Sequence, residues 1–154
     1  MIWLRYATRE DAEELFTIFH AAVHGGTTAF YSIEERQAWA PSPTPSPVWP
    51  DRLTDQLTIV ADSDIGPRGF MTLGWDGHLD LAYVHPSEMG RGIASRLHEG
   101  ILFIAQDLRL ERLTTEASHL ARRFFLKHGW REQAEQVVER RKVKIVNFRM
   151  ERDV

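Results

Sequence analysis

Residues 84–97 read VHPSEMGRGIASRL, with Gly90 and Gly92 between an apolar run that ends at Pro86 and a segment of helical periodicity. In such a loop, successive backbone N–H groups ahead of a helix can point into one concavity and bind a phosphate or pyrophosphate, helped by the helix dipole. The two glycines and the small Ala94 let an anion approach the main chain. Taken alone, the glycine pair favours a simpler interpretation, a tight turn into a helix.

Two better-known phosphate-binding motifs fit this loop poorly. A nucleoside triphosphatase loop needs Gly-Lys-Ser/Thr after four spacer residues, and neither the lysine nor the spacing is present. A dinucleotide fingerprint needs a third glycine where Ser95 stands, and alternating parallel strands and helices around it. Three strand-like segments precede this loop instead, so the sequence excludes the first motif and disfavours the second.

His20 and His24 have the four-residue spacing that places two imidazoles on one face of a helix, as in zinc sites. The chain lacks the glutamate of a His-Glu-x-x-His motif, an evident third ligand and any cysteine. The sequence therefore predicts no metal site, no disulfide and no cysteine nucleophile.

Composition indicates a single domain over residues 1–154, with 43% hydrophobic and 27% charged residues. The N-terminus has no signal-peptide core, and no run approaches the roughly 20 apolar residues of a bilayer span. We therefore expect a cytoplasmic protein without a membrane partner. A net charge of −3 gives no general attraction to nucleic acid, and the basic ERRK turn is most simply a solvated hairpin tip.

Hydrophobic periodicity predicts a mixed order of elements, with one irregular aromatic and proline-rich stretch, 27–50, near the start. The expected strands are residues 2–6, 57–62, 69–75, 78–84, 112–117, 130–139 and 142–150. The expected helices are one from Ala12 to the glycines at 25 and 26, a short one at 33–38 followed by an extended loop, one at 92–108, and one capped by Ser118 that stops at Gly129.

The order of elements and several sequence segments resemble the GNAT superfamily of N-acetyltransferases. These segments are LRYATREDAEELFTIF, LAYVHP, MGRGIASRL, LTTEAS and ARRFFLKHGW. The resemblance covers essentially the whole chain. The superfamily's loop pattern, Gln/Arg-x-x-Gly-x-Gly/Ala, is met by Gly92 and Ala94, with Met89 at its first position. FYSIEERQAWAP and NFRM are similar to a bacterial subgroup of small single-domain acetyltransferases. The resemblance implies an α+β GNAT acyltransferase fold, with a mixed, mostly antiparallel central sheet splayed at the fourth strand and helices on both faces.

The same resemblance implies that acetyl-CoA is the acetyl donor and that a primary amine attacks its thioester directly. The cofactor-binding residues it implies are Ala82, Tyr83 and Val84 on the splayed strand, Met89, Gly90, Arg91, Gly92, Ile93 and Ala94 in the loop, and Ser118. The aromatic residues between Tyr31 and Trp49 could wall a compact acceptor site, so we expect a small-molecule amine ahead of a peptide N-terminus. The oligomeric state stays open, a homodimer included. The alternative is a non-catalytic module that binds acyl-CoA as a sensor or a partner-binding domain.

The catalytic groups are where this chain departs from the family. Phe125 occupies the place of a tyrosine that, in many members, protonates the departing sulfur. A thiol of pKa about 8.5 released near pH 7 without its proton costs roughly 2 kcal/mol, whereas deprotonating an alkylamine of pKa about 10.4 costs roughly 4.6 kcal/mol. The base therefore matters more than the acid. Glu116 is the candidate base, or else a structural carboxylate paired with an arginine; Tyr31 could orient the amine or donate a proton, or else pack beneath the loop.

Overall fold

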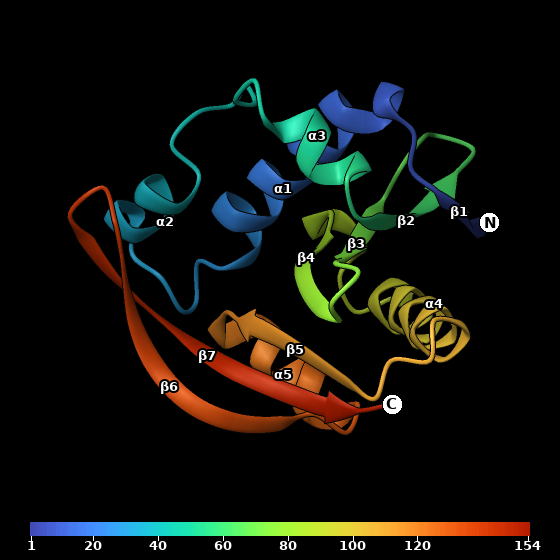
Figure 1. Cartoon of the computed structure of the whole chain (residues 1–154). Helices are drawn as coiled ribbons and strands as arrows, with labels where there is room; N and C mark the ends of the chain where they lie inside the picture. Colours follow the sequence, from blue (N-terminus) through green and yellow to red (C-terminus); the bar gives the residue numbers. More distant parts are fainter.

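A seven-stranded sheet in the order β1-β2-β3-β4-β5-β7-β6 forms the centre of the computed structural model, which describes residues 1–154 (Figure 1). Every pair of neighbouring strands is antiparallel except β4 and β5, which are parallel. The expected mixed, mostly antiparallel sheet is confirmed. Its strands are β1 (Ile2–Tyr6), β2 (Leu57–Ser63), β3 (Gly69–Leu73), β4 (His78–Val84), β5 (Arg112–Ala117), β6 (Arg131–Arg140) and β7 (Val143–Asp153).

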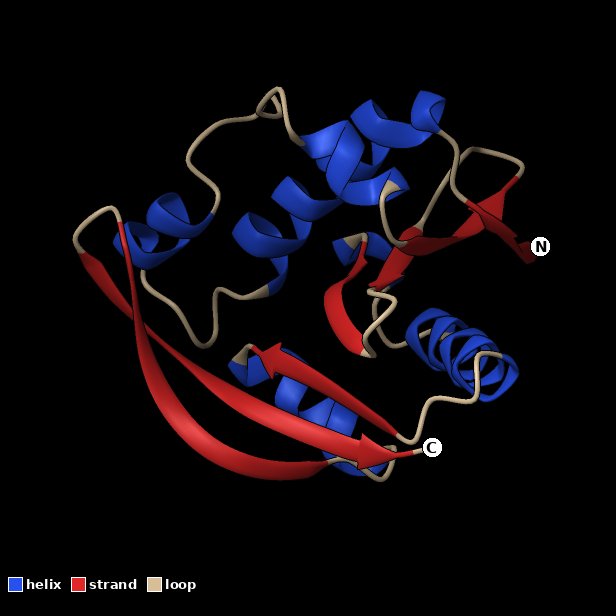
Figure 2. Cartoon of the chain, viewed as in Figure 1, coloured by secondary structure: helices blue, strands red, loops and turns tan.

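The sheet splays at β4, as expected. β4 pairs with β5 only at His78 and Leu79, although both strands continue past this pair. Figure 2 shows two groups of strands, β1 to β4 and β5 to β7, that diverge from this contact. On the other edge of β4 the register shifts, since Leu81 opposes Thr72 while Leu79 opposes Leu73. Asp80 is thus the extra residue of a β-bulge, which bends β4 away from β5.

Helices cover both faces of the sheet. The long helices are α1 (Ala12–Gly26) and α4 (Ile93–Asp107); the shorter ones are α2 (Ile33–Trp39), α3 (Trp49–Thr54) and α5 (His119–Lys127), with 3-10 turns η1 (Arg9–Asp11) and η2 (Pro86–Glu88). No helix is long and apolar enough to cross a bilayer.

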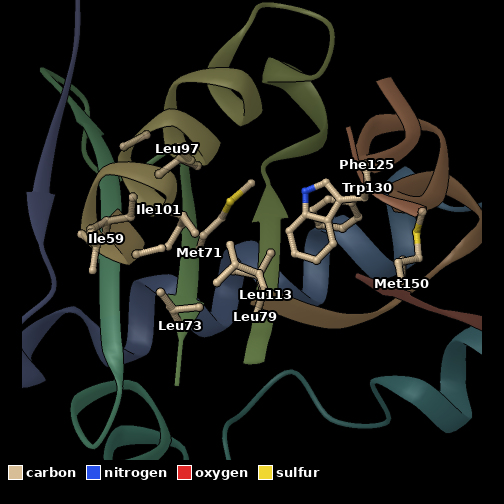
Figure 3. Close-up of a cluster of buried hydrophobic side chains, with 14 of the residues drawn as sticks. Ile59, Met71, Leu73, Leu79, Leu97, Ile101, Leu113, Phe125, Trp130 and Met150 are labelled. Atoms are coloured by element: carbon tan, nitrogen blue, oxygen red, sulfur yellow. The ribbon is translucent and has the colours of Figure 1, made fainter. Parts of the chain in front are cut away.

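Successive side chains of each strand point to opposite faces of the sheet, so each face packs against a different set of helices. Ile59 and Met71 pack with Leu97 and Ile101 of α4, and this core extends to Phe125 of α5 (Figure 3). On the other face, the neighbouring residues of the same strands, together with Leu81, form a second core with α1 and α3. The split between β4 and β5 therefore has a helix layer on each side.

The stretch from residue 27 to residue 50 differs from the expectation in one respect. The extended loop was expected to run through Pro50, but α3 begins at Trp49, and a proline in the first turn of a helix loses no hydrogen bond. Trp49 is only 4% exposed, and its indole N–H donates to the carbonyl of Ala12 at 2.8 Å. The expectation that Trp49 walls an acceptor site was wrong, because this side chain packs in the core between α1 and α3.

Candidate active site

Two cavities meet where the sheet splits. The loop cavity, of about 500 Å³, lies between the end of β4, the glycine loop and α5. The polar cavity, of about 300 Å³, lies between α2, α3, β4 and the strands β5 to β7. Trp39, Tyr83 and Ser118 line both. The two cavities therefore adjoin at these three residues.

All the predicted cofactor-binding residues except Arg91 line the loop cavity. The Arg91 side chain is 70% exposed and its guanidinium lies 3.7 Å from the carboxylate of Glu88. The structure thus brings together the β4 residues, the loop residues and Ser118 around one space, and leaves Arg91 at its rim.

The glycine loop has the backbone geometry of an anion site. Gly90 and Gly92 have φ values of 79° and 83°, which other residues rarely adopt, and a Cβ at either position would meet nothing within 4 Å. Gly92 directly precedes α4, whose first N–H groups have no partner within the helix. None of the backbone N–H groups of residues 90–95 donates a hydrogen bond to another group of the chain. Six consecutive donors are therefore free beside the cavity.

Two glycines at the end of α1 support this loop. A Cβ on Gly25 would lie 3.3 Å from Cγ of Pro86, and one on Gly26 would lie 3.3 Å from the sulfur of Met89. The expectation that the helix ends at these glycines is confirmed, because Gly26 is the last residue of α1. They allow α1 to pack closely against the loop, and Met89 packs there while also lining the cavity.

The edge of β4 that faces the split is free beyond Leu79, since its pairing with β5 ends there. Ala82 and Val84 remain paired to β3 on the other edge, opposite Met71 and Gly69. Main-chain groups on the free edge can therefore bind an extended ligand in the loop cavity, as an added strand would.

Glu116 lines the polar cavity, and its carboxylate makes no hydrogen bond or ion pair with the rest of the chain. It stands opposite Arg149 in the register of β5 and β7, but the two side chains form no salt bridge. The structure therefore does not contain the arginine-paired carboxylate of the alternative interpretation, and the Glu116 carboxylate is free to contact a ligand in the cavity.

Tyr31 also lines the polar cavity, but its hydroxyl is already engaged. It donates to the carbonyl of Val146 at 2.7 Å and accepts from the backbone N–H of His119 at 3.0 Å. Burial raises the pKa of Tyr31, so the phenol stays protonated near neutral pH. These bonds favour a structural position beneath the cavity wall over a proton-donating one.

An ion pair that the sequence analysis did not find also lines the polar cavity. Arg52 of α3 donates to both carboxylate oxygens of Asp80, at 2.8 and 2.9 Å, and Gln56 donates to the same carboxylate at 3.0 Å. Burial opposes the charge on Asp80, but these hydrogen bonds outweigh it and lower its pKa. The pair escaped detection because it depends on the β-bulge at Asp80 and on α3, neither of which was expected.

No hydroxyl replaces the family's tyrosine at position 125. Phe125 is 1% exposed and its ring centroid lies 4.8 Å from that of Trp130. Where the cavities meet, Tyr83 and Ser118 carry hydroxyls. Burial raises the pKa of Tyr83 to about 12. The Ser118 oxygen accepts from the N–H of Ala121 at 3.1 Å, which confirms the expected N-cap and leaves its own proton free to be donated.

The histidine pair on α1 lies outside both cavities. The rings of His20 and His24 are 4.4 Å apart, and Nε2 of His24 is hydrogen-bonded to the carbonyl of Ala40 at 2.7 Å. No group of three or more potential ligand side chains is arranged to hold a metal ion.

Known proteins resemble this chain in both sequence and fold. Residues 28–152 match the family model of the acetyltransferase (GNAT) domain. The chain is 29% identical over 140 residues to an uncharacterized N-acetyltransferase, YafP, of Escherichia coli, with 91% of this chain and 88% of that protein covered.

Two solved structures superpose over its full length. A GCN5-related N-acetyltransferase from Rhodopseudomonas palustris has a TM-score of 0.94 at 30% identity, with 96% of that chain covered. The PaiA N-acetyltransferase from Thermoplasma acidophilum, solved in complex with coenzyme A, has a TM-score of 0.81 at 17% identity, with 99% of that chain covered.

Proposed function

Because the chain belongs to the GNAT acetyltransferase family, we propose that it transfers the acetyl group of acetyl-CoA to a primary amine of a small molecule. The observation that carries this proposal is the row of six unpaired backbone N–H groups at residues 90–95, which lies beside a cavity that meets a second, polar cavity. The loop cavity suits the acetyl donor, and the polar cavity suits the amine acceptor.

The loop cavity has the features that coenzyme A requires. Free N–H groups at a helix N-terminus suit a pyrophosphate, and the free edge of β4 suits the amide-bearing pantetheine arm. The Thermoplasma protein of the same fold was solved with coenzyme A bound, which supports the same ligand here. When bound, acetyl-CoA supplies a thioester; the residues that would hold it are Ala82, Tyr83, Val84, Met89, Gly90, Gly92, Ile93, Ala94 and Ser118, with Arg91 at the rim.

The polar cavity suits a small-molecule amine. Its volume is about 300 Å³, and Tyr31 and Trp39 form part of its wall. The β6–β7 strand pair contributes Val138, Ile145 and Asn147 on one side. A cavity enclosed on several sides by α2, α3 and this strand pair favours a small molecule over a peptide N-terminus.

Glu116 takes the proton from the acceptor amine in this mechanism, directly or through water. Its carboxylate is unpaired, lies in the polar cavity and precedes Ser118 by only two residues, so it is close to the junction of the cavities. Removing a proton from an alkylamine at pH 7 costs roughly 4.6 kcal/mol. A positioned carboxylate is therefore the group that the reaction most requires.

Ser118 donates a hydrogen bond to the departing sulfur in this mechanism, and the released thiolate takes its proton from solvent. Its oxygen is held by the N–H of Ala121, which orients the remaining O–H, and it lines both cavities. A serine hydroxyl is too weak an acid to give its proton to a thiolate, but releasing the thiolate unprotonated costs only roughly 2 kcal/mol near pH 7, and the hydrogen bond offsets part of this cost. Phe125 then needs no polar substitute at its own position.

The test is thiol release from acetyl-CoA with a panel of primary amines, corrected for hydrolysis, alongside calorimetric binding of coenzyme A. We expect binding, and amine-dependent release with at least one class of amine. Binding without acceleration by any amine in a broad panel would favour a non-catalytic acyl-CoA-binding module, for which Phe125 is the main support. Absence of binding would contradict the assignment of the loop cavity.

A further inference from the structure

The polar cavity contains charges of both signs that do not all pair with each other. Arg52 and Asp80 satisfy one another through two hydrogen bonds. Glu116 has no partner in the chain. The Arg140 guanidinium makes no ion pair, and its one hydrogen bond goes to the backbone carbonyl of Glu139 at 3.3 Å. One negative and one positive side chain therefore line the cavity without partners.

These two side chains reach the cavity from well-separated backbone positions. In the register of the sheet, Glu116 lies opposite Arg149 of β7, whereas Arg140 lies opposite Val143 at the hairpin end of β6. These positions are six residues apart along β7, which corresponds to about 20 Å along the strand. Both residues line the cavity, so they border it from opposite ends of this stretch of the strand pair.

A third unsatisfied group lies on the floor between them. Oδ1 of Asn147 is buried and accepts no hydrogen bond, although buried oxygens in folded proteins usually do. In the register, Asn147 is two residues from Arg149, so it lies near the Glu116 end. Asn147 therefore has a polar atom that nothing in the chain satisfies, next to the Glu116 end of the cavity.

From these groups, and resting on the transferase function proposed above, we infer that the acceptor is an elongated amine with an anionic group at its other end. The amine lies at Glu116, and Arg140 binds the anion, a carboxylate or a phosphonate-like group. A simple alkylamine leaves Arg140 unmatched. A diamine places a second cation beside it, which costs free energy instead of gaining it.

The inference is tested by comparing amines of equal length that differ only at the far end. The panel is γ-aminobutyrate, δ-aminovalerate and ε-aminocaproate, each with its matched n-alkylamine, diamine and aminoalkylphosphonate. We expect kcat/KM to be roughly 10- to 100-fold higher for the amino acids or phosphonates than for the matched alkylamines, and lowest for the diamines. The anionic group, carboxylate or phosphonate, that gives the higher kcat/KM is the one that Arg140 binds.

Arg140→Ala should remove this preference, lowering kcat/KM for the anionic amine roughly 10- to 100-fold while changing that for the alkylamine less than about 2-fold. Lys144→Ala is the matched control, because it removes the same charge from the same hairpin at a position that does not line the cavity. Its selectivity should equal that of the unmodified protein. Melting temperatures of both variants establish that they fold.

Equal kcat/KM for charged and uncharged amines, or an equal loss for both in Arg140→Ala, would overturn the inference while leaving the transferase function intact. A preference for diamines would overturn it in the same way. If the proposed transferase function itself is wrong, the result is distinguishable, because no amine of any class then accelerates thiol release.

Discussion

The hydroxyl of Tyr31 accepts a hydrogen bond from the backbone N–H of His119 at 3.0 Å, across 88 residues of sequence. The same hydroxyl donates to the carbonyl of Val146 at 2.7 Å. One side chain thus joins the segment before α2 to the start of α5 and to β7, three parts of the chain that meet around the polar cavity. Tyr31 entered the sequence analysis as a catalytic candidate, and its contacts favour a positioning role instead.

Tyr31→Phe should therefore lower the stability of the fold without changing which groups transfer protons in the reaction. It removes the Tyr31 partner of a partly buried N–H and of a partly buried carbonyl, which costs about 1–2 kcal/mol. We expect a lower midpoint in chemical denaturation, reduced kcat and a pH profile of unchanged shape. A variant of full stability whose activity loss is confined to one limb of the pH profile would instead identify Tyr31 as a proton donor or acceptor.

Glu116→Gln should lower kcat/KM about 100-fold or more near pH 7, because the amide cannot accept the amine's proton. The loss should shrink as the pH approaches about 10, where an alkylamine is already largely neutral. Glu111→Gln, at an exposed position before β5, is the matched control and should leave kcat/KM unchanged. A pH profile of Glu116→Gln parallel to that of the unmodified protein would remove Glu116 from the role of base.

Ser118→Asn keeps an N-cap of comparable strength but removes the hydroxyl. We expect an unchanged melting temperature and a kcat about 10-fold lower throughout the range from about pH 7 to about pH 9, because the departing thiolate loses a hydrogen bond. The measurement is single-turnover thiol release across this pH range, so that product release does not obscure the step. A rate at pH 7 equal to that of the unmodified protein would rule out this donor.

Gly92→Glu should abolish measurable binding of coenzyme A, since it places a carboxylate in the open space beside the free N–H groups. Gly92→Ala is the control for backbone strain, because any side chain at φ 83° costs about 1–2 kcal/mol regardless of charge. Calorimetric titration of coenzyme A compares the two. Equal affinities of the glutamate and alanine variants would contradict a pyrophosphate site at this loop.

His98 should make the protein less stable as the pH falls from about 6.5 toward 4. It is 2% exposed and accepts a hydrogen bond from the indole N–H of Trp130 at 2.9 Å. Burial, aided by His128 and Arg152, lowers its pKa to about 4. Between that value and the ordinary one of about 6.5, the unfolded chain binds the extra proton, so stability rises with pH across this window by up to about 3 kcal/mol.

His98→Gln keeps an acceptor for Trp130 but cannot titrate. Urea denaturation at several pH values should therefore show a flatter dependence on pH for the variant between about pH 4.5 and 6.5. The expected difference is in the slope, not in the stability at pH 7. Parallel curves for the two proteins would show that His98 does not carry this dependence.

Local signals predicted much of the fold. Helix α4 was expected at 92–108 and is found at Ile93–Asp107, because its apolar stripe repeats over four turns and a glycine precedes it. The antiparallel meander of β2, β3 and β4 was also predicted, from the turn residues between its strands. Helix α3 was missed, because the prolines before it suggested a loop, while the burial of Trp49 that stabilises it depends on α1, far away in sequence.

The sequence by itself determined the family, the order of elements and the loop that offers free N–H groups, since these depend on neighbouring residues and on backbone conformation. Only the tertiary structure decided which side chains share the polar cavity: Asp80 enters it through a bulge, Arg52 from α3, and Arg140 from the end of a hairpin. It also decided that Tyr31 is bound on both sides while Glu116 is free. Hydrogen bonds and charges between segments distant in sequence leave no local pattern, and these contacts set the chemistry of the site.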